Sequence, residues 1–167
     1  MSRGFVKEDD QEDVPMVPPR AYLPPGVPNY VTRSGMDALL AERENLLRER
    51  DELDSSDERE RRIAANHLHA LLQLLDQRIA TAKLMEPGGQ KPVEIRFGAT
   101  VTIQVAGTEE IQTVQIVGVD EADIAGGKIS FISPLAKALI NKKAGDTAVL
   151  KLPREERVFE IIRVDYV

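Results

Sequence analysis

Apolar side chains recur at helical spacing through the first half of the chain and alternate with polar ones through the second half. In the first stretch, Leu39, Leu46 and Leu53 lie seven residues apart, with Leu40 and Leu47 beside them. The spacing resumes further along at Ile63, Leu68, Leu71, Leu72, Leu75, Ile79 and Ala82. Each stretch is apolar along one stripe only, so each must pack that stripe against a partner.

A polar junction separates the two helical stretches. Residues 51–60 read DELDSSDERE, in which six of the ten side chains are carboxylates. Asp and Ser compete for backbone hydrogen bonds and favour turns over helix interiors. We therefore predict an antiparallel helical hairpin with a first arm ~30 Å long, although a single uninterrupted helix is the alternative. Thr32 or Ser34 is expected to cap the first helix and Ser56 or Asp57 the second.

Alternation with β-branched residues begins near residue 99. It is carried by residues 99–105, 112–117, 128–132, 148–152 and 157–164. Period two with one apolar face predicts the strands of a small antiparallel sheet. A short helix is expected over 134–140, with Ser133 as N-cap and Pro134 in its first position, and Gly126-Gly127 predicts a turn. The fold class is α+β, an antiparallel coiled-coil hairpin followed by a small antiparallel β domain with one short helix.

Six of the ten prolines fall within residues 1–31, where they follow an acidic cluster at residues 8–13. Proline fixes φ and removes a backbone donor, so we expect a proline-rich acidic N-terminal extension that is poorly ordered. It is either a tail without function or a segment attached to the body by Val17, Tyr22, Leu23 and Tyr30. The remaining predicted segments are the hairpin with its acidic tip (32–86), a linker (87–92) and the β domain (93–167).

Composition excludes several classes of function. The net charge of −6 disfavours binding to bare nucleic acid, which needs Lys and Arg to displace counterions. The absence of Cys excludes disulfides and thiolate chemistry. No run has signal-peptide character or the length to span a bilayer, so we expect a cytoplasmic protein without membrane contact. His67 and His69 lie two apart on a predicted helix and point to different faces, which argues against a shared metal site.

The acidic junction is the main candidate for chemistry. One interpretation is a polar loop whose charges keep the tip solvated. The other is a pair of hard oxygen ligands, because Mg²⁺ binds few protein carboxylates and keeps several waters. Asp54 and Asp57 would then complete a metal site whose other ligands belong to another molecule. The free protein is expected to bind no metal tightly, since two carboxylates leave most of the coordination shell to water.

The run VGVDEADIAGGKISFISPLAKALINKKAGD, residues 117–146, resembles the signature of bacterial Gre (GreA/GreB) transcript-cleavage factors. The closing VFEIIRVDY resembles the final strand of that family. With the hairpin, the resemblance covers roughly residues 30–167, and it is a resemblance to a GreB-like variant with a shortened coiled coil. It implies an FKBP-like fold for the polymerase-binding domain at residues 93–167, without prolyl isomerase activity.

Gre factors bind RNA polymerase beside its secondary channel and pass the hairpin toward the active centre. The resemblance implies that the protein is no enzyme itself but stimulates the polymerase to cut the 3′ end of backtracked RNA. We expect it to act as a monomer. It implies a Mg²⁺ shared with the polymerase, with Asp54 and Asp57 as metal ligands. The catalytic tip would be Asp54, Asp57 and Glu58, and the polymerase contact would be Ser133, Pro134, Leu135 and Lys137.

The chain departs from the family pattern at several positions. Asp54 and Asp57 keep the spacing of the family's acidic pair, but Asp57 stands where Glu is usual, with Glu58 one place along. Asn141 replaces the usual Gly. These departures, with the short arm, keep two alternatives open: a Rnk-like regulator that binds polymerase without stimulating cleavage, and a coiled-coil adaptor of another complex.

Overall fold

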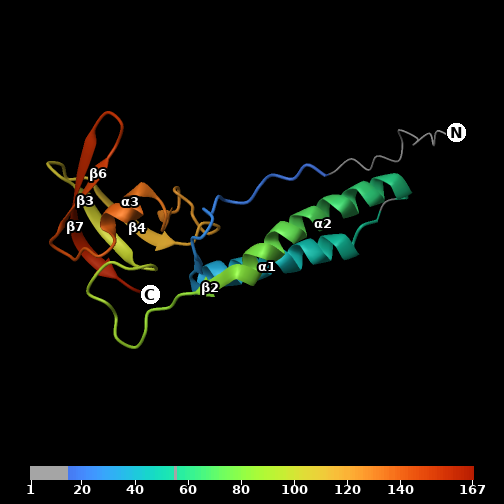
Figure 1. Cartoon of the computed structure of the whole chain (residues 1–167), viewed down its shortest axis with the longest axis horizontal. Helices are drawn as coiled ribbons and strands as arrows, with labels where there is room; N and C mark the ends of the chain where they lie inside the picture. Colours follow the sequence, from blue (N-terminus) through green and yellow to red (C-terminus); the bar gives the residue numbers. More distant parts are fainter. Residues whose placement is uncertain (1–14, 55) are drawn as a thin grey trace.

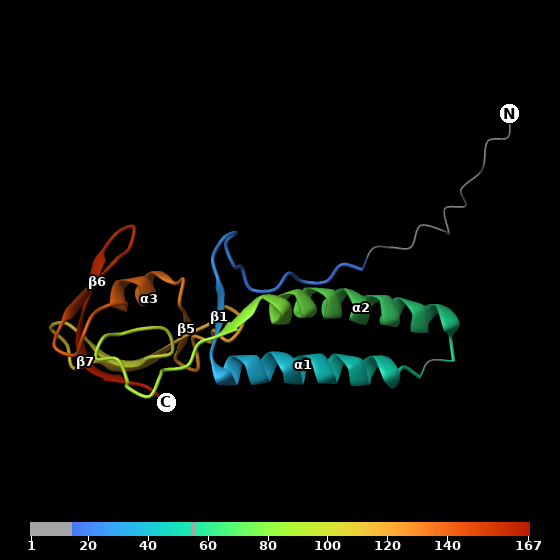
Figure 2. The ribbon, with the colours of Figure 1, turned by 60° about the horizontal axis from the view of Figure 1, so that its bottom comes forward.

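The structure, a computed structural model, describes residues 15–54 and 56–167; residues 1–14 and 55 lie outside the described part. Figure 1 shows a helical hairpin at one end of the molecule and a β domain at the other. The hairpin consists of α1 (Arg33–Asp51) and α2 (Glu58–Thr81). The two helices lie side by side in both views (Figures 1 and 2), so the polar junction forms a turn and the uninterrupted helix is excluded.

Each helix of the hairpin begins at a residue whose side chain caps it. The Thr32 hydroxyl accepts a hydrogen bond from the Gly35 amide at 3.0 Å. The Asp57 carboxylate accepts one from the Arg59 amide at 2.9 Å. Both residues were among the predicted caps, and each satisfies a backbone donor that the first helical turn leaves without a partner.

Leucines join the two helices. The buried ones are Leu39, Leu68, Leu72 and Leu75. Two members of the predicted apolar stripes are instead exposed, Leu40 by 44% and Ile63 by 58%. Leu40 follows Leu39, and successive residues on a helix point about 100° apart, so only one of them faces α2. Ile63 lies near the tip, where it lines a groove that is described below.

The second helix ends earlier than predicted. Residues Ala82–Leu84 form strand β2, which pairs in parallel with strand β1 (Asn29–Val31). The expectation that residues 1–31 are poorly ordered is therefore wrong for β1. The Asn29 amide donates to the Arg78 carbonyl at 2.9 Å, and Val31 is buried. A strand of three residues directly after a proline leaves almost no alternation in the sequence to detect.

The β domain is one five-stranded sheet with a short helix. Its elements are β3 (Thr100–Val105), β4 (Ile111–Val117), β5 (Lys128–Ser130), α3 (Pro134–Leu139), β6 (Thr147–Lys151) and β7 (Glu156–Asp165). The strand order is β5-β4-β3-β7-β6. Alternate residues such as Val101 and Ile103 are fully buried, and α3 adds Ala136 and Leu139 to the same core. The predicted α+β class, with hairpin first and β domain second, is confirmed.

One strand pair departs from the predicted antiparallel sheet. β5 pairs with β4 in parallel, whereas the other pairs in this sheet are antiparallel. The predicted turn at Gly126-Gly127 is present, and Gly127 has a φ of 72° that favours glycine. That turn reverses the chain within the segment between the strands, where Asp123 bridges to Lys128. The chain therefore enters β5 in the same direction as β4.

Ion pairs hold the hairpin against the β domain. Asp120, which follows β4, accepts from Arg20 at 3.0 Å and lies 3.5 Å from Arg78 of α2. Arg20 also binds Glu42 of α1 at 2.8 Å. Hydrogen bonding to Glu42, ahead of the nearby charge of Asp120, raises the pKa of the Arg20 guanidinium despite its partial burial. The Thr32 hydroxyl adds a second junction contact by donating to the Glu121 carboxylate.

Candidate functional site

The hairpin tip is the end of the two helices that lies farther from the β domain (Figure 2). Residues 52–57 join α1 to α2 there. Helix α1 has 19 residues, which corresponds to a length of ~28 Å. The three candidate residues Asp54, Asp57 and Glu58 are all exposed at this end. The structure therefore presents the acidic junction at the outer end of a two-helix rod.

Local structure fixes the orientation of one tip carboxylate. Asp57 is the N-cap of α2, so one of its oxygens accepts from the Arg59 amide. Glu58 and Glu60 follow in the first turn, where the positive end of the helix dipole stabilises negative charge. Capping thus explains why Asp suits position 57 even without a ligand. Asp54 lies in the connection between α1 and α2, is exposed, and caps neither helix.

The tip offers metal ligands without enclosing a metal site. Within residues 15–54 and 56–167, no group of three or more His, Cys, Asp or Glu side chains is placed to hold an ion. Carboxylate oxygens are nevertheless the ligands that Mg²⁺ prefers. The donor set of Asp54 and Asp57 therefore fits an ion whose other ligands come from another molecule. That these two residues bind a metal stays a prediction.

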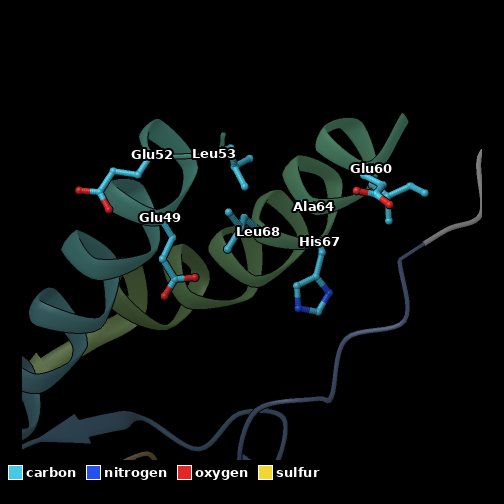
Figure 3. Close-up of a pocket in the computed structure, with 8 residues that line it drawn as sticks. Glu49, Glu52, Leu53, Glu60, Ala64, His67 and Leu68 are labelled. Carbon is cyan, nitrogen blue, oxygen red and sulfur yellow. The ribbon is translucent and has the colours of Figure 1, made fainter. Parts of the chain in front are cut away.

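A groove of about 690 Å³ opens between the helices next to the tip (Figure 3). We call it the tip groove; it is lined by Glu49, Glu52, Leu53, Glu60, Ile63, Ala64, His67 and Leu68. Its carboxylates come from both helices, while its floor is apolar. His67 lies in the groove wall and His69 is exposed elsewhere on α2. The apolar spacing assigned Ile63 to the hairpin core, so no pattern in the sequence predicted this groove.

The second candidate surface surrounds the start of α3 on the β domain. Ser133 caps this helix, accepting from the Ala136 amide at 3.3 Å. Pro134 and Lys137 are exposed, but Leu135 packs against the core of the β domain. Of the four predicted contact residues, Pro134 and Lys137 are therefore available to a partner, whereas Ser133 and Leu135 also support the fold.

No helix in the part of the chain that the structure describes is both long enough and apolar enough to cross a membrane.

Comparison with known proteins identifies the family. The family model described as "Transcription elongation factor, GreA/GreB, C-term" matches residues 90–166. The transcription elongation factor GreA of Trichlorobacter lovleyi is 36% identical over 151 residues, which cover 81% of this chain and 96% of the relative. The chain belongs to the GreA/GreB family of transcription elongation factors.

Two other members of the GreA/GreB family align with a shorter part of the chain. GreA of Hyphomonas neptunium is 47% identical over 92 residues, 55% of this chain and 59% of the relative. GreA of Halorhodospira halophila is 45% identical over 96 residues, 57% of this chain and 61% of the relative. In both alignments the chain spans only about three fifths of the relative. These relatives are named GreA, and the GreB-like character of this chain stays a prediction.

Solved structures of GreA/GreB proteins resemble the chain more distantly. GreA factor homolog 1 of Thermus thermophilus is 23% identical, with a TM-score of 0.38, and covers 81% of this chain and 97% of its own. A GreA/GreB factor from Nitrosomonas europaea is 20% identical, with a TM-score of 0.42, and covers 82% and 98%. At these scores the likeness adds no argument to the sequence relationship.

In this GreA/GreB family member, the junction between hairpin and β domain was missed by the sequence analysis. Arg20 and Asp120 are 100 positions apart in the chain, so no local pattern could join them. The available signal was the presence of apolar and aromatic residues in the proline-rich segment, from which attachment through Val17, Tyr22, Leu23 and Tyr30 was predicted as one alternative. Of these, Tyr30 does contact the β domain, with its ring 5.8 Å from that of Phe97 and 5.5 Å from that of Phe131.

Proposed function

We propose that this protein binds bacterial RNA polymerase and stimulates cleavage of backtracked transcripts through its hairpin tip. The observation that carries the proposal is the exposure of Asp54, Asp57 and Glu58 at the far end of a helical rod. That rod is joined to a domain that matches the GreA/GreB family model. The protein would act as a cytoplasmic monomer and supply ligands to the polymerase rather than a complete active site.

Asp54 and Asp57 are the residues that would contact a polymerase-held Mg²⁺. The ion, once bound, supplies charge stabilisation and an activated water for phosphodiester hydrolysis. The part of this chain is to bring carboxylate oxygens to the ion, with Glu58 next to them. The hairpin serves as a spacer, because leucine packing and two helix caps hold the tip at a fixed distance from the β domain.

The α3 surface would hold the β domain on the polymerase. Pro134 and Lys137 are the exposed members of the predicted contact. Replacing Pro134 with Ala removes an exposed proline ring at the start of α3. The fold should tolerate this change, because the backbone N–H at that position has no partner within the helix. Pro134→Ala and Lys137→Ala should each weaken polymerase binding and leave unfolding unchanged. Leu135→Ala should weaken polymerase binding and also lower the stability of the β domain, because Leu135 packs in its core.

A regulator without cleavage activity, as in the Rnk-like alternative, is favoured by one observation. With 19 residues, α1 extends the tip only ~28 Å from the start of the helix. An Asp side chain at the tip is also one methylene shorter than Glu. If the rod stops before the catalytic metal, the protein would bind the same site and compete with other factors for the channel.

The deciding experiment measures RNA cleavage in stalled, backtracked elongation complexes supplied with Mg²⁺. The wild-type protein should accelerate release of 3′ fragments. The double variant Asp54→Asn/Asp57→Asn should lose that stimulation and keep its affinity for polymerase. Asn caps a helix about as well as Asp, so the change removes charge without removing the cap. Asp37→Asn, an exposed carboxylate at the base of α1, is the matched control.

Three outcomes separate the possibilities. Stimulation by the double variant would show that the ligands are wrongly assigned. Binding by the wild-type protein without stimulation at any concentration would favour the non-cleaving regulator. Failure to bind polymerase would reject both and leave the coiled-coil adaptor as the remaining function.

A further inference from the structure

The hairpin already holds one arginine against both of its helices. Arg20 belongs to the segment that runs alongside α2 in Figures 1 and 2, and its guanidinium donates to both oxygens of Glu42 of α1, at 2.8 and 3.1 Å. The Arg20 side chain is partly buried there. Leu71 and Leu74 of α2 line the same small cavity as Arg20 and Glu42. We call Glu42, Leu71 and Leu74 the arginine seat, in which a carboxylate of α1 is combined with apolar side chains of α2.

The tip groove repeats the arginine seat one heptad nearer the tip. The two helices are antiparallel, so a step of seven residues toward the tip adds seven to a position on α1 and subtracts seven on α2. This step leads from the seat to Glu49, Ala64 and His67, and all three line the tip groove. Seven residues return to nearly the same face of a helix and advance ~10.5 Å along its axis. The groove therefore has a carboxylate of α1 and side chains of α2 in the same relation as the seat.

The two sites differ in their width and in the partner of the carboxylate. Ala64 stands where the seat has a leucine, and the tip groove measures about 690 Å³ against about 300 Å³ for the cavity at the seat. Figure 3 shows Glu49 and His67 pointing to the same side of the hairpin. Unlike Glu42, the Glu49 carboxylate forms no hydrogen bond or ion pair with any other residue that the structure describes. The groove thus offers the carboxylate of the seat to a partner from another molecule.

The lining of the groove defines the chemistry of that partner. Ile63 is 58% exposed and forms an apolar surface with Leu53 and Leu68. Glu52 lines the groove beside Glu49, and no Lys or Arg is among its described lining residues. An apolar side chain would be desolvated on this surface, and a guanidinium would match a carboxylate with two parallel hydrogen bonds. The same carboxylates would repel the phosphates of RNA, so the chemistry favours a protein segment.

We propose that the tip groove binds an arginine-containing segment of a partner protein, with the guanidinium on Glu49 and apolar neighbours of the arginine against Ile63. The precedent is the chain's own Pro18-Pro19-Arg20 at the arginine seat. Leu53 of the groove directly precedes the tip residue Asp54, so a bound segment would hold the tip from its side. Under the proposed function the segment would belong to RNA polymerase, and this assignment alone rests on that function.

A fluorescein-labelled peptide with the sequence of residues 15–23, PMVPPRAYL, is the probe, because it carries the arginine and prolines that the seat holds. Its fluorescence anisotropy should rise and saturate on titration with the full-length protein. Glu49→Gln should weaken binding about two- to fivefold, as for the loss of one exposed ion pair. A peptide with Lys in place of Arg should bind more weakly, because an ammonium cannot form the forked contact. A peptide with Ala in that place should bind most weakly.

Glu44→Gln is the matched control, because Glu44 is an exposed glutamate of α1 that does not line the groove. It should leave the affinity for the peptide unchanged. The proposal is overturned if the peptide shows no saturable binding, or if Glu49→Gln and Glu44→Gln both bind it like the wild type. It is also overturned if Glu42→Gln loses binding while Glu49→Gln keeps it, because the peptide would then replace the chain's own segment at the seat.

Sedimentation of the protein without peptide tests the remaining occupant. A dimer that forms with rising concentration and is lost in Glu49→Gln would mean that the groove takes a second copy of the chain, which would also overturn the proposal. No polymerase is present in these measurements, so their failure leaves the cleavage proposal intact. Conversely, a protein that binds the peptide but fails to stimulate cleavage would refute the proposed function and leave the groove assignment standing.

Discussion

Asp57 combines a structural and a proposed functional role in one carboxylate. As the N-cap of α2 it satisfies the Arg59 amide, and as an exposed tip residue it is a candidate metal ligand. Replacement by Ala removes both roles, whereas replacement by Asn removes only the charge. We predict that Asp57→Ala destabilises the start of α2 by about 1 kcal/mol. Hydrogen exchange of the amides in the first turns of α2 measures this directly.

Asp57→Asn should leave that exchange close to wild type. Asp54→Ala is the second comparison, because Asp54 lies outside both helices. If Asp57→Ala and Asp54→Ala accelerate exchange equally, the cap has no special contribution and the stability of α2 comes from leucine packing alone.

Tyr166 should make the stability of the protein depend on pH. Its ring is buried, its hydroxyl donates to the Glu94 carbonyl, and it accepts from the Arg96 amide at 2.9 Å. Burial raises the pKa of this phenol, outweighing the opposing hydrogen bond from Arg96. The unfolded chain therefore releases the proton first, at about pH 10. The stabilisation is complete below that pH and is lost as the pH rises through the folded-state pKa.

Tyr166→Phe should lower the free energy of unfolding by about 1–2 kcal/mol at pH 7, because two backbone groups lose their partner. The difference in the free energy of unfolding between wild type and variant should shrink as the pH rises above about 10. Urea titrations at several pH values test this. Tyr22→Phe is the control, because Tyr22 is 74% exposed. A difference that stays constant with pH would contradict the prediction.

Single residues were predicted well where their role is local. The caps Thr32, Asp57 and Ser133 were named among the candidates because a cap depends only on the following three residues. Asn141 also depends on local backbone geometry: its φ of 68° is left-handed, a conformation that Asn tolerates and that suits the Gly which the resemblance implies at this position. The contact between Arg20 and Asp120 depends on the tertiary fold and could not be found this way.

At the scale of elements, strands with regular alternation were predicted and short pairings were not. Residues 100–105 and 156–165 repeat the apolar side chain often enough for period two to be recognised. β1 and β2 have three residues each and pair across 53 positions, Asn29 with Ala82. For the same reason Ala82 was assigned to the helix, whose heptad spacing it happens to continue. The tertiary pairing overrides this local pattern.

Gly118 allows β1 to approach the β domain. A Cβ added there would lie 2.4 Å from the Tyr30 carbonyl oxygen, a backbone atom that cannot move without the strand. We predict that Gly118→Ala lowers the free energy of unfolding by about 1–3 kcal/mol, as for overpacked sites. Chemical denaturation measures the loss. Gly88→Ala is the matched control, because a Cβ there meets nothing within 4 Å.

An equal effect of Gly118→Ala and Gly88→Ala would mean that the loss arises from the unfolded chain rather than from the contact with Tyr30. A crystal structure of Gly118→Ala would offer a second check, because the Tyr30 carbonyl should lie farther from residue 118 than in the wild type.

At the scale of the whole molecule, the direction of the rod depends on a few charged contacts. The proposed function needs the tip and the α3 surface at a fixed separation, yet they belong to different parts of the fold. The contacts that join these parts are the Thr32–Glu121 pair, the aromatic contacts of Tyr30 and the ion pairs of Asp120. Of these groups, Arg20 alone comes from the segment before the first strand, which lies outside the region that the resemblance covers.

Arg20→Ala should therefore loosen the rod more than it unfolds either part. The Arg20 side chain is only 19% exposed and bridges Glu42 to Asp120, so its loss should cost about 1.5–3 kcal/mol, as for hydrogen bonds to charged groups. The chain has no Cys, so spin labels can be placed at Glu52→Cys near the tip and Arg154→Cys on the β domain. The distance distribution between the labels should broaden in Arg20→Ala.

Arg33→Ala supplies the comparison, because the Arg33–Glu86 pair has both side chains at least half exposed and such pairs contribute little. Arg20→Lys should give an intermediate width, since a lysine keeps the charge but cannot reproduce the two-pronged contact with Glu42. If Arg20→Ala leaves the distribution as narrow as Arg33→Ala does, the Tyr30 cluster and the Thr32–Glu121 pair are sufficient to orient the rod.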